Sequence, residues 1–106
     1  MTGIDIQKDV QDILTAVLKT HLTNGEEVYV FGSRVKGAAG KYSDLDIAID
    51  GNGKKLDFSL ECALKGDLEE SDIPYRVDII DLNAITPQFR KLIQDDLVSL
   101  RLPYRT

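Results

Sequence analysis

The chain has 106 residues, of which 42% are hydrophobic and 29% are charged, and its formal net charge is −5. Such a chain is expected to fold as one domain, residues 1–106, and the acidic balance speaks against a general nucleic-acid binder, which needs a basic face. No stretch reaches the roughly 20 apolar residues of a membrane span, and the N-terminus lacks the apolar run of a secretory signal. The single cysteine, Cys62, excludes an internal disulfide and fits a reducing cytoplasm. We expect it to be a small buried side chain.

The first third of the chain predicts a helix followed by a strand. Apolar residues recur at spacings of three and four between Ile6 and Leu22, which is typical of an amphipathic helix. His21, the only histidine, falls in its last turn, where the helix dipole favours a surface position over catalysis or metal binding. Residues 28–31 form a continuous apolar run, which predicts a strand covered on both faces.

A short helix and a second strand are expected after Gly32. Residues 33–36 can start a helix capped by Ser33, and a glycine-rich loop follows. From Asp44 to Asp50, polar and apolar residues alternate, which predicts a strand with one face in the core. Because side chains alternate along a strand, Asp44 and Asp46 share its other face.

The remaining elements follow at regular intervals. Residues 51–55 read as an exposed turn, residues 57–70 as a helix, and residues 76–82 as a third strand. Thr86 and Pro87 are typical of a helix start. The alternation of Val98, Leu100 and Leu102 predicts an extended tail or edge strand, serving either as a docking surface for a partner or as a terminal core strand.

Three carboxylates are candidates for a metal site. Asp44 and Asp46 share a strand face, and Asp78 lies inside an apolar strand, where an unpaired carboxylate needs a partner or a metal. Three such groups repel one another, and Mg²⁺ is the natural compensating ion. Two Mg²⁺ ions could activate an attacking oxygen and stabilise a departing pyrophosphate, and Asp78 could also help to deprotonate the acceptor.

The turn after residues 28–31 is the candidate phosphate site. Gly32 lets the backbone approach phosphate oxygens, and Ser33 offers its N–H and its hydroxyl. Arg34 and Lys36 belong to a locally basic stretch beside the aspartates and are expected to contact phosphate as well. The alternatives are an ordinary strand–helix turn and a solvated basic loop.

These motifs together resemble a known family. Gly32-Ser33, Gly37 and Ser43-Asp44-Leu45-Asp46, followed by a later strand aspartate, are similar to the nucleotidyltransferase superfamily of DNA polymerase beta, and the short chain resembles its minimal nucleotidyltransferase (MNT) family. The resemblance implies an α/β (α+β) fold, a small mixed sheet flanked by helices as in the polymerase beta palm. It also implies a nucleoside triphosphate at Gly32-Ser33 and magnesium held by Asp44, Asp46 and Asp78.

The resemblance also implies a partner and a reaction. Many prokaryotic MNT proteins pair with a helical HEPN-domain protein as the antitoxin of a toxin–antitoxin module, and some transfer AMP from ATP to a tyrosine of that partner. We therefore expect a Mg²⁺-dependent transferase that moves a nucleoside monophosphate to a protein hydroxyl. The leading expectation is AMP transferred from ATP. Since 106 residues leave little room for an acceptor-binding domain, a hetero-oligomer is expected. The alternative is a non-catalytic nucleotide-binding antitoxin that acts by forming a complex.

Overall fold

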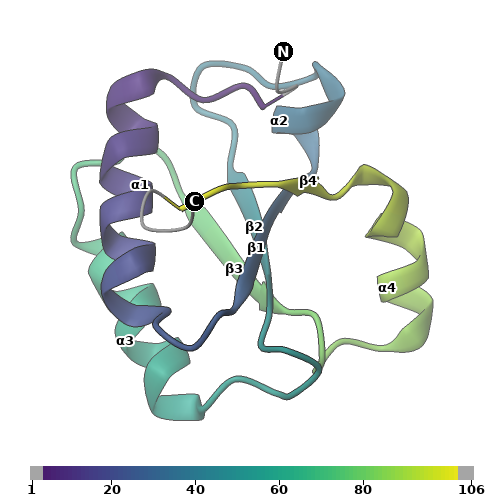
Figure 1. Ribbon diagram of the computed structural model, residues 1–106. Coiled ribbons are helices and arrows are strands. Elements are labelled where there is room, and N and C mark those ends of the chain that lie inside the picture. Colours follow the sequence, from purple (N-terminus) through teal and green to yellow (C-terminus); the bar gives the residue numbers. More distant parts are fainter. Residues whose placement is uncertain (1–3, 103–106) are drawn as a thin grey trace.

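The fold is a four-stranded mixed sheet with helices on both faces, as the computed structural model of residues 4–102 shows (Figure 1). Helices α1 and α3 lie side by side on one face, and α4 lies on the other. The elements are α1 (Lys8–His21), β1 (Glu27–Phe31), α2 (Ser33–Lys36), β2 (Leu45–Asp50), α3 (Phe58–Glu69), β3 (Val77–Asp81), α4 (Pro87–Ile93), the 3₁₀ helix η1 (Gln94–Asp96) and β4 (Val98–Ser99). The predicted mixed sheet flanked by helices is confirmed.

The strand order β3-β2-β1-β4 places β2 in the interior of the sheet and β3 at an edge. Strand β1 pairs antiparallel with β2 and β4, whereas β2 and β3 run parallel. The register sets Phe31 opposite Asp46 in the first pair and Asp46 opposite Asp78 in the parallel pair. Because β2 is shared, the end of β1 and the start of β3 both lie beside Asp46.

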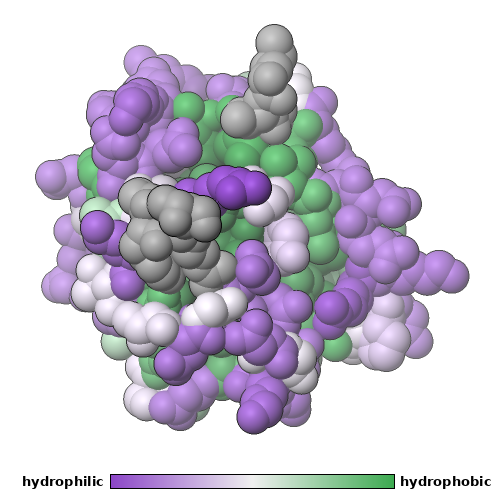
Figure 2. Space-filling view, in the orientation of Figure 1, coloured by the Kyte–Doolittle hydropathy of each residue, from purple (hydrophilic) through white to green (hydrophobic). Residues whose placement is uncertain are grey.

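The alternation along β2 divides it between two apolar layers. Leu45, Ile47 and Ile49 are fully buried in the main core, which α1 and α3 cover. Burying each such side chain stabilises the fold by about 1.5–3 kcal/mol. On the opposite face, Ala48 packs in a smaller apolar cluster with Ile93 of α4. The space-filling view shows hydrophilic side chains over the flanking helices and apolar ones gathered between them (Figure 2).

The C-terminal alternation belongs to the core. Leu100 and Leu102 are 5% and 1% exposed, and the backbone N–H of Leu100 donates to the carbonyl of Val28. This is the terminal core strand rather than the docking surface. The four residues that follow lie outside the described part of the chain. Between residues 4 and 102, no helix is both long and apolar enough to cross a membrane.

Three local predictions need correction. Cys62 is exposed, because it lies two residues before the buried Leu64 and so on the other side of α3. Gly32, not Ser33, is the N-cap of α2, and the Ser33 side chain forms no capping hydrogen bond. His21 is half-buried, with 17% of its side chain exposed, and its Nε2 lies 2.5 Å from Oδ2 of Asp67, which joins α1 to α3.

Candidate active site

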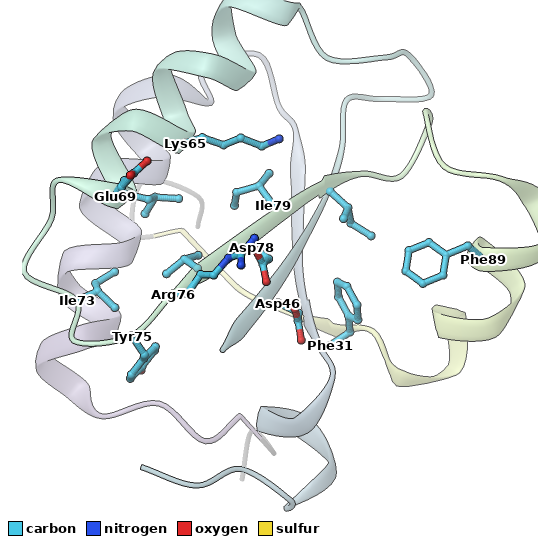
Figure 3. Close-up of a pocket in the computed structure, with 13 residues that line it drawn as sticks. Phe31, Asp46, Lys65, Glu69, Ile73, Tyr75, Arg76, Asp78, Ile79 and Phe89 are labelled. Carbon is cyan, nitrogen blue, oxygen red and sulfur yellow. Dashed lines mark ion pairs between the residues drawn. The ribbon is translucent and has the colours of Figure 1, made fainter. Parts of the chain in front are cut away.

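Two of the three predicted acidic residues meet at the β2–β3 pair. Asp46 and Asp78 are directly opposite each other in the parallel register, so their side chains emerge on the same face of the sheet. Both line a cleft of about 870 Å³ (Figure 3). The sheet thus brings together two carboxylates that are far apart in the sequence.

The electrostatics of this pair centre on Asp46. Partial burial raises the pKa of the Asp46 carboxyl, and the nearby charges of Asp78 and Asp44 raise it further. Asp44 itself is exposed and directly precedes β2. Burial and two like-charged neighbours thus both disfavour the ionised form of Asp46, the innermost of the three carboxylates.

Asp78 has a cationic neighbour that the sequence analysis did not single out. The Nε of Arg76 lies 2.7 Å from Oδ1 of Asp78, and the Arg76 side chain is 75% exposed (Figure 3). Residues two apart on a strand share a face, so this pairing could have been inferred from the sequence. The pair neutralises Asp78 with a side chain that is free to move toward solvent.

Gly32 packs against the carboxylate of Asp46. Its backbone has φ 81° and ψ −155°, a region that only glycine adopts readily. A Cβ added there would overlap Oδ2 of Asp46, so glycine is required by conformation and by space. The predicted phosphate turn and the predicted metal residues are thus in contact.

Ser33 and Lys36 follow Gly32 on α2. The Ser33 hydroxyl is half-buried and forms no hydrogen bond with another residue of the described range 4–102. The Nζ of Lys36 lies 3.2 Å from Oδ2 of Asp96, and its side chain is 57% exposed. Lys36 therefore has a surface partner that a phosphate would have to displace.

Arg34 points into the protein rather than toward the cleft. Its guanidinium donates to the carbonyls of Ser43, Lys41 and Asp5, and it lies 3.8 Å from the ring centroid of Tyr75. The side chain is only 5% exposed. The expected phosphate contact needs correction: these carbonyls satisfy the guanidinium, so Arg34 positions the loop that leads to Asp44.

The walls of the cleft were not anticipated either. Phe31 and Phe89 lie on one side of β3, and Lys65 and Glu69 of α3 lie on the other (Figure 3). These side chains come from three separate elements, so no local sequence pattern marks them as one surface. They make the acidic pair part of a groove that continues past it.

The donor set fits a hard divalent cation. Mg²⁺ is usually held by one or two carboxylates together with substrate phosphates and water. Asp46 and Asp78 supply such a pair, and the negative charges of Asp78 and Asp44 beside Asp46 are what a cation would offset. Residues 4–102 contain no group of three or more acidic, His or Cys side chains arranged to hold a metal by themselves.

Comparison with known proteins identifies the family. Residues 11–100 match the family described as "Polymerase beta, Nucleotidyltransferase". This range is most of the chain, so the protein belongs to the polymerase beta family of nucleotidyltransferases, as the motifs predicted.

A curated relative places the chain more closely. It is 40% identical over 103 residues to a protein of Haemophilus influenzae (strain ATCC 51907 / DSM 11121 / KW20 / Rd) named "Probable protein adenylyltransferase MntA". The match covers 94% of this chain and 90% of that protein. The predicted kinship with minimal nucleotidyltransferases is confirmed.

A solved structure shares the fold. A crystal structure of a toxin–antitoxin with AMP-PNP superposes with a TM-score of 0.71 at 23% identity, over 86% of this chain and 72% of that one. At this identity the likeness concerns the fold alone.

Proposed function

We propose that this nucleotidyltransferase is a protein adenylyltransferase, which transfers AMP from ATP to a hydroxyl group of a partner protein. The observation that carries the proposal is the packing of Asp46 between Asp78 and Gly32. It joins a carboxylate pair to a turn where the backbone can approach a ligand closely. The adenylyltransferase name of the 40% identical relative supports AMP as the transferred group.

In the proposed reaction, the acceptor binds on the Asp78 side of Asp46 and the triphosphate binds on the Gly32 side. The acceptor oxygen attacks the α-phosphorus of ATP, the bond between that phosphorus and the bridging oxygen breaks, and pyrophosphate leaves. The hydroxyl proton passes to a base, and Asp78 is the candidate because it lines the cleft from the edge strand β3. Gly32 and Ser33 bind the triphosphate. The Ser33 hydroxyl is available as a hydrogen-bond donor, and Lys36 on α2 supplies a positive charge for the phosphates.

Mg²⁺ is the proposed cofactor. Asp46 and Asp78 would hold it, with Asp44 nearby, and it would supply charge neutralisation for the phosphates. The chain's own contribution is to keep Asp46 in place. Strand β2 fixes its backbone, and Gly32 leaves room for its carboxylate.

The partner is proposed to be a helical HEPN-domain protein that forms a toxin–antitoxin pair with this chain. The toxin–antitoxin neighbour and the MntA relative support this assignment. The groove that Asp46 and Asp78 line is open to solvent, which suits an acceptor supplied by another protein.

The proposal is tested by measuring transfer of label from ATP to the partner protein. Purified chain is incubated with Mg²⁺ and a candidate HEPN-domain partner protein, with ATP labelled on either the α- or the γ-phosphorus. Adenylyl transfer labels the partner only from α-labelled ATP. A double variant, Asp44→Asn with Asp46→Asn, is expected to transfer no label, and full transfer by this variant would refute the acidic site.

A second candidate is an antitoxin that acts by covering its partner, with nucleotide binding retained. The ion pair between Asp78 and Arg76 favours this alternative, because it occupies the proposed base in the free chain. A stable complex that forms with ATP present but carries no label would support this alternative.

A further inference from the structure

The outer edge of β3 is unpaired. Strand β3 is the last strand on its side of the sheet, and no strand between residues 4 and 102 pairs with its outer side. Its register with β2 runs without a bulge from Val77 to Asp81, and no proline lies within it. Prolines and bulges are two of the features that commonly protect an edge strand, because an open edge offers hydrogen bonds to another chain.

The hydrogen bonds to β2 identify which groups are free. The carbonyl of Arg76 accepts from Leu45, and the N–H of Leu82 donates to Ile49. In a parallel pair the residues alternate in facing the partner strand. The backbone N–H and C=O groups of the even-numbered residues of β3 therefore point toward β2. Those of Val77 and Ile79 point outward, where no described residue bonds them.

The same edge forms the floor of the candidate active-site groove. Val77, Asp78, Ile79 and Ile80 all line it, between the α3 wall and the phenyl rings of Phe31 and Phe89 (Figure 3). The groove is therefore a channel that has the outward backbone donors and acceptors of β3 along its floor, with the acidic pair beside them. Such a channel selects an extended backbone rather than a helix.

We propose that the acceptor enters as an added β-strand: an extended segment of a partner protein pairs with the outer edge of β3 and presents a Ser, Thr or Tyr hydroxyl to Asp78. The proposal deepens the proposed function and rests on it. In a paired strand, directly opposite residues project to the same face. The residue opposite Asp78 thus places its side chain beside Asp78 and Asp46, while its neighbours project toward α3.

The proposal predicts an alternation along the acceptor peptide. Only every second residue of an added strand directs its N–H toward β3, and N-methylation removes that donor. In antiparallel addition the residues on either side of the hydroxyl residue bond to Val77 and Ile79, whereas in parallel addition the hydroxyl residue itself does. Sensitivity must alternate in both cases, and its phase reports the direction of the strand.

The experiment uses a blocked heptapeptide library with Tyr, Ser or Thr fixed at the centre and random flanks. The library is incubated with the chain, Mg²⁺ and α-labelled ATP, and the best acceptor is resynthesised with one N-methyl group at each position in turn. Methylation at alternate positions is expected to lower kcat/KM at least about tenfold, the loss of roughly one hydrogen bond, and the intervening positions should stay within about twofold. Uniform tolerance or uniform loss would overturn the proposal.

A matched pair of variants tests the protein side. Val77→Pro removes an outward N–H from an edge strand, and Val77→Ala trims the side chain but keeps that N–H. Val77→Pro is expected to raise KM for the peptide at least about tenfold over Val77→Ala, with KM for ATP unchanged. Equal KM values would overturn the proposal. If Val77→Pro fails to fold by circular dichroism, the N-methyl series decides on the unaltered chain.

ATP binding in the same samples separates two kinds of failure. An unlabelled library with ATP bound, by equilibrium dialysis with Mg²⁺, overturns strand addition and leaves the proposed function standing. Loss of ATP binding overturns the proposed function itself. Light scattering tests for a third outcome, a dimer that forms through β3. If the chain is dimeric, Val77→Pro is monomeric and the library stays unlabelled, the edge belongs to a second copy of the chain and the proposal is overturned.

Discussion

The carboxylate of Asp46 fills the space that a side chain at Gly32 would need. A Cβ at residue 32 would overlap its Oδ2 and lie 3.2 Å from its Cγ. The contact follows from the register, because Phe31 is opposite Asp46 and Gly32 is the next residue along the chain. The turn that is proposed to bind phosphate and the residue proposed to hold metal thus constrain each other.

Gly32→Ala is expected to remove both stability and transfer. The positive φ costs roughly 1–3 kcal/mol for a non-glycine residue, and the added methyl displaces the Asp46 carboxylate. We expect a lower free energy of unfolding in urea and at least about tenfold slower labelling, the equivalent of about 1.4 kcal/mol in the barrier.

Gly37→Ala is the matched control. Gly37 has φ 73°, and a Cβ there would meet nothing within 4 Å. The strain should cost about 1 kcal/mol of stability and leave transfer intact. Equal loss of transfer in both variants would show that strain alone, and not the Asp46 contact, accounts for the effect.

Asp46→Asn is expected to stabilise the fold while it abolishes transfer. The folded pKa of Asp46 is raised above its ordinary 3.8, so ionised Asp46 disfavours the folded state at neutral pH. In the unsubstituted chain this penalty is absent below pH 3.8 and grows as the pH rises through the folded pKa. Thermal unfolding without Mg²⁺ should therefore show a higher Tm for the variant at pH 7 and no difference at pH 3. Transfer should fall by at least about a hundredfold.

The control for Asp46→Asn is Asp95→Asn, which removes the same charge from an exposed position in η1. Its Tm should show no such gain at pH 7, and its transfer should be unchanged. A gain of equal size at position 95 would trace the effect to the net charge of the chain instead of to the acidic pair.

Much of this architecture could be predicted because its signals are local. The alternation in β2 alone assigns Asp46 to the face opposite Ile47, and the Thr86 cap is visible as a Thr-Pro pair; its hydroxyl accepts from the N–H of Phe89. The grouping of Asp46 with Asp78 was predicted from charge, because a carboxylate inside an apolar strand needs a partner or a metal; periodicity alone does not say which strands are neighbours.

What could not be predicted depends on distant partners. Arg34 looked like a free cation because nothing in residues 33–37 shows that the carbonyls of Asp5 and Ser43 surround it. The groove has the same origin, since α3, β3 and α4 each supply part of it. Local patterns reveal which face a residue takes, and tertiary contacts decide whether that face is free.

Arg34→Lys is expected to destabilise the fold without a specific effect on ATP. Lysine cannot reproduce the planar guanidinium that bonds several carbonyls at once, and a buried unsatisfied carbonyl costs about 1–3 kcal/mol. We expect a loss of about 2 kcal/mol in the free energy of unfolding. At temperatures where the variant is folded, KM for ATP should change little.

Lys36→Ala provides the comparison for Arg34. Its exposed ion pair with Asp96 contributes about 0–1 kcal/mol, so stability should barely change. If Lys36 contacts phosphate as proposed, KM for ATP rises in this variant. A rise in KM for ATP with Arg34→Lys and none with Lys36→Ala would reverse the two assignments.

Asp50→Asn should have the opposite effect on stability to Asp46→Asn, although both residues lie on one face of β2. Hydrogen bonds from the Gly53 N–H and the Asn83 side chain hold the pKa of Asp50 below its ordinary 3.8. Its stabilisation is therefore complete above pH 3.8 and is lost as the pH falls through the folded pKa. Because charged acceptors form stronger hydrogen bonds than neutral ones, the variant should lose about 1 kcal/mol at pH 7, and this difference should close in acid. Urea unfolding at pH 7 and pH 2.5 measures both, and transfer should persist because Asp50 lies at the other end of the strand. A stability gain at pH 7 would contradict the view that the sign is set by each carboxylate's own neighbours.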